Sequence, residues 1–121
     1  MPTFNAEQIA AISQRVLEGA GTPSSDAAIV AHELALANMF GHDSHGIIRL
    51  KQYVDYINEG VIKVGAEIQT VLELASIAVL DGGGNYGQVT AHAALELATS
   101  KAKELGAFSV LCRNSNHVGR L

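Results

Sequence analysis

The sequence is poor in the residues on which several classes of protein depend. Tryptophan is absent and aromatic residues make up 5 % of the chain, so the core must be packed largely from small aliphatic side chains. Cys112 is the single cysteine, which excludes an internal disulfide and a zinc site built from thiolates. Because Cys112 follows the largely apolar residues 108–111, we expect it to be a buried core thiol.

Basic residues and long apolar runs are also scarce. Eight Lys and Arg stand against 12 Asp and Glu, for a formal net charge of -4. Nucleic-acid binding depends on clustered positive charge, so no nucleic-acid partner is expected. The N-terminus lacks the basic and apolar regions of a signal peptide, and no apolar run approaches the length that crosses a bilayer. We therefore expect a cytoplasmic protein without a membrane partner.

What the sequence does contain is 48 % hydrophobic residues, arranged as three helices followed by a strand-strand-helix-strand unit. Asn5 and Gln8 have the spacing of a capping box at the start of the first helix. The apolar face of this helix is predicted to consist of Ile9, Ile12, Val16 and Leu17. Helices are predicted over residues 5–20, from about 25 to 39, over 46–58 and over 88–105. Strands are predicted over residues 68–74, 76–80 and 107–113.

This order predicts the α/β fold class, with a helical N-terminal layer (residues 1–60) leading into a mixed sheet that begins an α/β domain (residues 61–121). The last strand should lie at a sheet edge or await a partner. Because the sequence stops after a strand and a polar loop, where another helix usually follows, we expect these 121 residues to be part of a larger unit.

Residues 82–87 match the pattern G-x-G-x-x-G between a predicted strand and a predicted helix, which is typical of a dinucleotide-binding turn. Two features argue against that function. Asp81 places a negative charge at the entrance, and Asn114 ends the next strand where a ribose-binding Asp or Glu is expected. The sequence therefore favours a tight turn whose glycines permit close packing.

A first candidate site lies at residues 42–49. His45, Arg49 and Tyr53 are spaced four apart, so they could share one helix face. An Arg can hold a carboxylate through two hydrogen bonds, and a His can transfer a proton to a developing alkoxide. The alternative is a solvated loop in which Asp43 or Ser44 caps the helix, and the local pattern leaves both interpretations open.

A second candidate site follows the last strand, at residues 114–119. Ligands of α/β proteins bind beyond the carboxyl ends of strands, and His117 lies there. With His45 it forms a pair that could serve proton transfer and carbonyl polarisation. A metal site built from His42, Asp43, His45 and His117 is a rival interpretation, but no known metal-binding spacing supports it. We expect no metal.

Together these segments resemble one family, the type 2 malate/L-lactate dehydrogenases, which also include ureidoglycolate dehydrogenase, sulfolactate dehydrogenase and 2,3-diketogulonate reductase. The resemblance covers essentially the whole chain, although family members run much further. Its motifs are Asp43-Ser44-His45-Gly46 with Arg49 and Tyr53, Asp81-Gly82 with Gly87-Gln88, and Ser115-Asn116-His117-x-Gly119.

The resemblance implies hydride transfer between NAD or NADP and a small 2-hydroxy or 2-oxo acid, on a nicotinamide-binding fold that is not the Rossmann fold. It implies that His117 and His45 are the acid/base residues and that Arg49, Ser44 and Asn116 bind the substrate, while the cofactor-binding residues stay unassigned. It also implies a homodimeric full-length enzyme and an inactive fragment. The competing interpretation is a non-catalytic fragment, or a small-ligand or interaction module.

Overall fold

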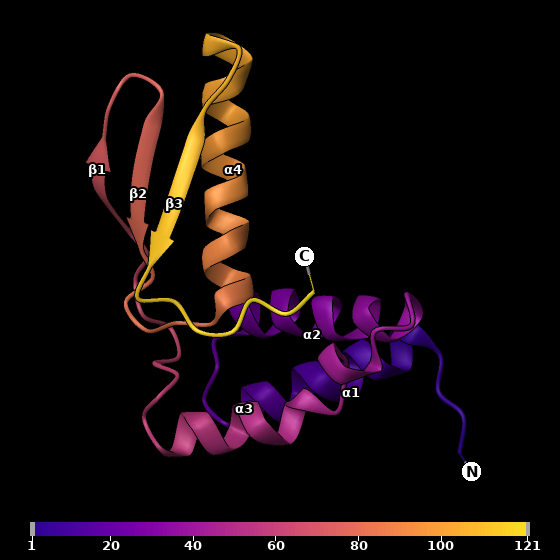
Figure 1. The fold of residues 1–121 in the computed structure, drawn as a ribbon. Coiled ribbons are helices and arrows are strands. Elements are labelled where there is room, and N and C mark those ends of the chain that lie inside the picture. Colours follow the sequence, from indigo (N-terminus) through magenta and orange to yellow (C-terminus); the bar gives the residue numbers. More distant parts are fainter. Residues whose placement is uncertain (1, 121) are drawn as a thin grey trace. The chain divides into compact units, whose positions relative to one another are not determined.

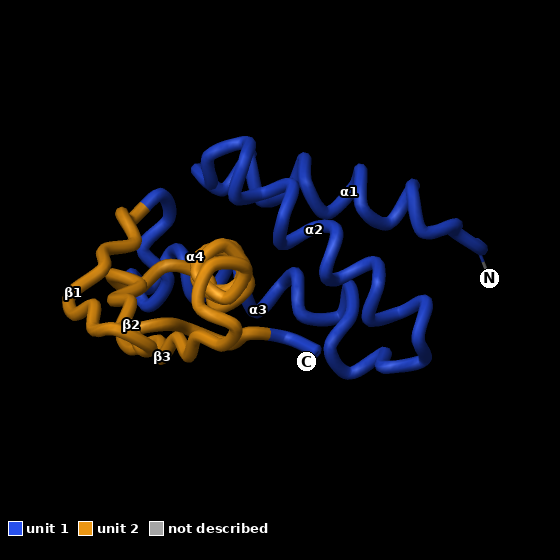
Figure 2. Tube along the Cα trace, turned by 90° about the horizontal axis from the view of Figure 1, so that it is seen from above, with its two compact units in different colours: residues 1–65, 119–121 blue, residues 66–118 orange. Residues whose placement is uncertain are grey.

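The computed structural model describes residues 2–120, which form two compact units (Figure 2). The first contains the described residues up to 65 together with 119 and 120, and the second contains residues 66–118. Each unit has its own secondary structure, in the predicted order of helices followed by a small mixed sheet (Figure 1). The division of the larger protein into domains near residue 60 stays a prediction.

The first unit is helical. Its elements are the helices α1 (Ala6–Gly19), α2 (Ser24–Met39) and α3 (Arg49–Asn58) and the short 3-10 helix η1 (Asp43–His45). The predicted capping box of α1 is present, because Asn5 Oδ1 accepts a hydrogen bond from the Gln8 N–H at 2.9 Å and Gln8 Oε1 accepts one from the Asn5 N–H at 3.0 Å. The sequence thus specifies where this helix begins.

The core of the first unit forms where α1 packs against α2. The buried side chains of α2 recur at helical spacing and are mostly small, as predicted: Ala27, Val30, Ala31, Leu34 and Ala37. From α1, Ser13 and Leu17 are fully buried, whereas Ile12 and Val16 are 41 % and 40 % exposed. The contact is therefore centred on Ser13 and Leu17. Leu17 is buried as predicted, whereas Ile12 and Val16 of the same predicted face are exposed.

The second unit consists of a three-stranded sheet and one long helix, α4 (Gly87–Leu105). The strands β1 (Gln69–Glu73), β2 (Ile77–Asp81) and β3 (Ser109–Arg113) lie in the order β1-β2-β3. β1 and β2 are antiparallel and β2 and β3 are parallel, so the sheet is mixed, as predicted. Among residues 2–120, β3 pairs on one side only, so the last strand does lie at an edge.

Cys112 is the clearest departure from expectation in this unit. It pairs in register with Leu80 of the central strand, yet it is exposed, so the prediction of a buried core thiol is wrong. The reason is the edge position of β3, which leaves the strand without a neighbour on one side within the described sheet. The burial that remains raises the pKa of the Cys112 thiol above its ordinary value, which lowers the fraction of reactive thiolate at neutral pH.

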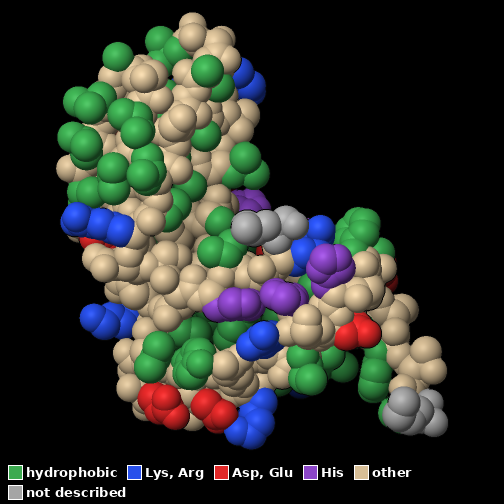
Figure 3. Space-filling view, in the orientation of Figure 1, with side chains coloured by type: hydrophobic (Ala, Val, Ile, Leu, Met, Phe, Trp, Pro, Cys, Tyr) green, Lys and Arg blue, Asp and Glu red, His purple; other side chains and the backbone are tan. Residues whose placement is uncertain are grey.

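One face of the sheet carries exposed apolar side chains. Leu72, Val79 and Leu111 are register partners across the three strands and so share a face, opposite to that of the buried Ala78 and Leu80. Leu72 and Leu111 are 46 % and 50 % exposed. Figure 3 shows apolar side chains gathered over this part of the chain.

Among the described residues, no helix is both long and apolar enough to span a membrane.

Candidate active site

The predicted site residues divide between the two units. Ser44, His45 and Arg49 belong to the first, and Asn116 and His117 belong to the second. Each group has a defined local geometry within its own unit. That the two groups meet around one substrate stays a prediction from the sequence.

In the first unit, His45 ends the single turn of η1. Its backbone N–H donates to the His42 carbonyl at 2.8 Å, and the Ser44 hydroxyl lies 2.9 Å from its Nδ1. Which of these two atoms donates depends on the tautomer of the ring. The contact engages Nδ1 and so restrains the orientation of the imidazole.

Arg49 is the first residue of α3. Its Nε donates to the Ser44 carbonyl at 2.7 Å, and its Nη1 donates to Gln52 Oε1 at 2.7 Å. Gln52 in turn donates from Nε2 to the Tyr56 hydroxyl at 2.8 Å. These bonds fix the guanidinium of Arg49 against the loop that carries His45, while a guanidinium has five N–H donors in all and thus retains capacity for an anion.

The shared helix face expected for His45, Arg49 and Tyr53 is not formed. His45 belongs to the 3-10 turn, and α3 begins only at Arg49. The helix is interrupted because Gly46 adopts an extended backbone, with φ -90° and ψ -151°. Arg49 contacts the motif through the Ser44 carbonyl instead, so the imidazole of His45 and the guanidinium of Arg49 belong to different elements.

An open pocket of about 350 Å³ lies beside this loop, lined by Ser44, Ile48, Arg49 and Gln52. It combines a hydroxyl, a guanidinium and a side-chain amide with one apolar wall, Ile48, which is 71 % exposed. A guanidinium recognises a carboxylate through paired hydrogen bonds. The pocket can therefore take a small anionic ligand with an apolar or uncharged remainder.

Asn38, in the last turn of α2, was not predicted from the sequence to belong to this site. Its side-chain amide donates to Asp43 Oδ1 at 2.7 Å and accepts from the Ile47 N–H at 2.8 Å. The one available signal was an Asn inside a helix, where it is unfavourable unless its side chain finds a partner. That signal alone does not identify the partner.

In the second unit, the glycine loop holds the segment that carries His117. The Asn116 side chain donates from Nδ2 to the Gly84 carbonyl at 2.7 Å and to the Asn85 carbonyl at 3.2 Å. The backbone N–H of Asn116 donates to the same Asn85 carbonyl at 3.2 Å. Asn116 therefore ties the segment after β3 to the loop after β2, and its predicted contact with substrate stays a prediction.

The glycines of this loop permit close packing, as the sequence predicts. A Cβ at Gly87 would lie 2.3 Å from the Asn116 carbonyl oxygen and 2.4 Å from the His117 carbonyl carbon. A Cβ at Gly82 would lie 2.7 Å from Thr90 Oγ1. The chain's own atoms fill the space that a pyrophosphate would need, so these residues do not fit a dinucleotide and none of them is assigned to a cofactor.

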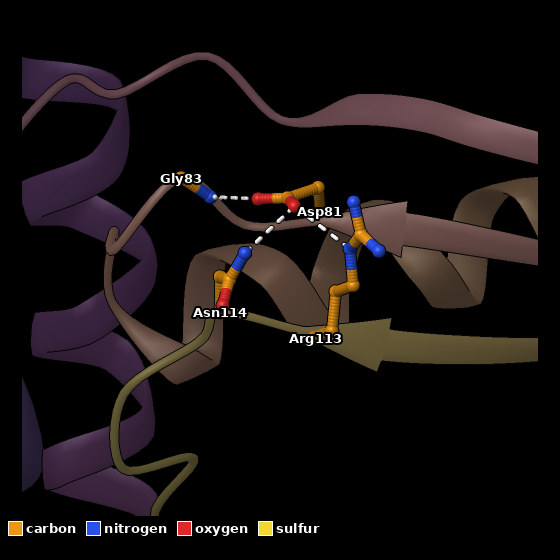
Figure 4. A network of polar contacts seen from close by, with 4 residues as sticks. All are labelled: Asp81, Gly83, Arg113 and Asn114. Carbon is orange, nitrogen blue, oxygen red and sulfur yellow. Dashed lines mark hydrogen bonds and ion pairs between the residues drawn. The ribbon is translucent and has the colours of Figure 1, made fainter.

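Asp81 organises the entrance of the same loop (Figure 4). Its carboxylate accepts from the Gly83 N–H at 2.9 Å, from Arg113 Nε at 2.9 Å and from Asn114 Nδ2 at 2.8 Å. The Gly83 bond, supported by Arg113 and Asn114 against the opposing effect of burial, lowers the pKa of Asp81. Asn114 has a φ of 49°, in the left-handed region that Asn tolerates, and this turns the chain from β3 toward His117.

The lowered pKa of Asp81 predicts an acid-sensitive loop. A carboxylate whose folded pKa lies below its unfolded value stabilises the fold fully above about pH 4, and this contribution is lost as pH falls through the folded pKa. During an acid titration, the amide shifts of Gly83 and Asn114 should move together in that range. In Asp81→Asn this step should vanish, whereas Asp55→Asn in the first unit should leave it intact. A step that persists without the Asp81 carboxylate would contradict the assignment.

Among residues 2–120, no group of three or more His, Cys, Asp or Glu side chains is placed to hold a metal ion. The rival metal interpretation of His42, Asp43, His45 and His117 therefore gains no geometric support. The chemistry that the two local sites do offer is an imidazole beside a hydroxyl, a fixed guanidinium, and a second imidazole on a tightly held turn.

Known proteins are similar to this chain in both sequence and fold. A malate dehydrogenase of Pyrococcus abyssi is 47 % identical over 105 residues, which are 87 % of this chain and 29 % of that protein. Hydroxycarboxylate dehydrogenase B of Escherichia coli is 36 % identical over 118 residues, 98 % of this chain and 33 % of that protein. The structure of malate dehydrogenase from Pyrococcus horikoshii OT3 superposes with a TM-score of 0.94 at 39 % identity, covering 98 % of this chain and 34 % of that one.

The chain thus spans about a third of the length of these relatives. The match extends over both units and includes the motifs around His45 and His117, which supports the resemblance noted from the sequence. Residues 4–121 match the family model described as malate/L-lactate dehydrogenase, and the chain belongs to that family.

Proposed function

We propose that the protein containing this chain is a nicotinamide-dependent dehydrogenase that interconverts a small 2-hydroxy acid and the corresponding 2-oxo acid. The observation that carries the proposal is the membership of the chain in the malate/L-lactate dehydrogenase family. The pocket beside Arg49, which is suited to a small carboxylate, supports it.

In this proposal Arg49 holds the substrate carboxylate, and Ser44 lines the same pocket. His45, oriented by the Ser44 hydroxyl, polarises the carbonyl or exchanges a proton with it. His117 donates the proton to the developing alkoxide during reduction. Asn116 contributes to the substrate site while it ties the His117 segment to the loop after β2.

The proposal needs NAD or NADP, whose reduced form would supply the hydride for reduction of the 2-oxo acid and whose oxidised form would accept it in the reverse reaction. Because the glycine loop of this chain is filled by its own backbone, we place cofactor binding in the part of the protein that lies outside these residues. The 121-residue chain by itself is therefore proposed to be inactive. A homodimeric full-length enzyme is proposed by analogy with the family.

The test is to measure NADH and NADPH oxidation with a panel of 2-oxo acids, for this chain and for the full-length protein. We expect turnover by the full-length protein only. Turnover by neither protein with any panel member would refute the dehydrogenase assignment. Robust turnover by the 121-residue chain would refute the placement of the cofactor outside it.

Replacing Arg49 with Lys tests the carboxylate contact. Lys keeps the positive charge but loses the forked geometry and the bond to the Ser44 carbonyl. We expect the KM for the 2-oxo acid to rise by about 10- to 100-fold with a smaller change in kcat, because a uniform binding contact is weakened. The matched control is Lys51→Arg, an exposed residue of the same helix that pairs with Asp55. An unchanged KM in Arg49→Lys would remove Arg49 from the substrate site.

A further inference from the structure

We propose that Asn38 is a positioning residue for the active-site loop, and that its side-chain amide clamps the two ends of the turn that carries Ser44 and His45. This inference rests on the proposed function, because it concerns how His45 is held for catalysis. It assigns a role in the reaction to a residue of α2 that lies outside the Asp43-Ser44-His45-Gly46 motif.

The turn needs an external support. None of the three residues of η1 is buried, so apolar packing does not hold it. Its backbone is closed by two hydrogen bonds, from the His45 N–H to the His42 carbonyl at 2.8 Å and from the Gly46 N–H to the Asp43 carbonyl at 3.2 Å. The hydrogen-bond geometry of a 3-10 turn is poorer than that of an α-helix, so contacts from outside the turn, such as the Arg49 bond to the Ser44 carbonyl, help to hold it in place.

Asn38 supplies that support from the side of α2. Its Nδ2 donates to Asp43 Oδ1 at 2.7 Å, at the start of the turn, and its Oδ1 accepts from the Ile47 N–H at 2.8 Å, just beyond the end. Both halves of the amide are used, one on each side of His45. A carboxylate at this position could not make both bonds, because it has no hydrogen to donate to Asp43.

The Asn38 amide lies directly against Gly46. A Cβ on Gly46 would lie 2.1 Å from Asn38 Oδ1 and 2.5 Å from its Nδ2. The φ of Gly46 is -90°, so a positive φ is not the reason for glycine at this position. The absence of a side chain at Gly46 leaves the space that the Asn38 amide occupies, which links this residue of the motif to a side chain in the preceding helix.

The two hydrogen bonds can be tested with variants that remove them or reverse which side chain donates. Asn38→Leu removes both at similar volume. Asn38→Asp keeps an acceptor for the Ile47 N–H but places a like charge opposite Asp43. Combining Asn38→Asp with Asp43→Asn puts a donor opposite the new carboxylate, so both bonds can re-form with the first one reversed. Recovery in the paired variant is a result that loss of folding could not produce.

Two measurements test separately whether the Asn38 clamp exists and whether it supports catalysis. In this chain, the amide hydrogen exchange of Ile47 should become about tenfold faster or more in Asn38→Leu, since a hydrogen bond is lost. In the full-length enzyme, kcat should fall by about 10- to 100-fold with little change in KM, because His45 is misplaced. Asn38→Asp should show the same changes, and the paired variant should recover most of both.

The matched control is Val30→Ala, a buried position of the same helix, which should lower thermal stability while leaving kcat and the exchange of Ile47 unchanged relative to the rest of the unit. Unaltered Ile47 exchange in Asn38→Leu, no recovery in the paired variant, or faster exchange with an unchanged kcat would each overturn the proposal. If the unaltered full-length protein turns over no 2-oxo acid, the proposed function fails, while the exchange data still decide whether the clamp exists.

Discussion

Replacing His117 with Ala in the full-length enzyme is expected to lower kcat/KM for 2-oxo acid reduction by about 10²- to 10⁴-fold, the usual contribution of a general acid. The acid must be protonated to act, so the rate of the unaltered enzyme should fall as pH rises through its pKa. In His117→Ala this fall in rate at high pH, the high-pH limb of the profile, should disappear. The measurement is kcat/KM against pH with saturating reduced cofactor.

His45→Ala distinguishes the two imidazoles. If His117 is the donor, His45→Ala should lower the rate while the limb at high pH remains, because the donor is still present. If only His45→Ala lost the high-pH limb, His45 and not His117 would be the proton donor. His92→Ala, at an exposed position of α4, is the matched control and should be within about twofold of the unaltered enzyme. Normal turnover in His117→Ala would exclude His117 from proton transfer.

Much of the fold follows from local patterns. The capping box at Asn5 and Gln8 begins α1 where the sequence predicts, and the spacing of small apolar residues predicts the buried side of α2. The break between η1 and α3 could not be predicted in this way. The apolar spacing of residues 46–58 continues through the break, and the extended backbone of Gly46 depends on an amide from another helix.

In the second unit, the exposure of side chains is harder to predict from the sequence than the positions of the strands. The β-branched residues of the sequence predict β1 and β2, but the exposure of a strand is set by its neighbours in the sheet and not by its own pattern. Every residue of β1 is exposed, and Cys112 of β3 is exposed as well. The largely apolar sequence of residues 108–111 therefore does not indicate that Cys112 is buried.

Candidate site residues can be named from the sequence, because few residue types can bind a carboxylate or move a proton, and their roles stay predictions. The contacts that hold them cannot be named in this way. Asp81 meets Arg113 across 32 positions of sequence, and Asn116 meets Gly84 across another 32. Such pairs depend on the parallel pairing of β2 with β3, which brings the two loops to one end of the sheet.

The largest expected effect on the structure comes from Gly87→Ala. The new Cβ would lie 2.3 to 2.4 Å from atoms of the Asn116 and His117 backbone, which cannot rotate away as a flexible side chain would. We expect overpacking to cost about 1–3 kcal/mol, and therefore to lower Tm by about 4 °C or more. Turnover of the full-length enzyme should fall by about 10²-fold, because the His117 turn is displaced.

Gly19→Ala is the matched control, since Gly19 is also a helical glycine but has no atom within 4 Å of the position that a new methyl group would take. Its stability should equal or exceed that of the unaltered chain, because Ala favours a helix over Gly. The two variants add the same methyl group, so a difference between them measures the contact at Gly87. If Gly87→Ala kept its Tm and left the amide shifts of Asn116 and His117 unmoved, the loop would not hold His117 as described.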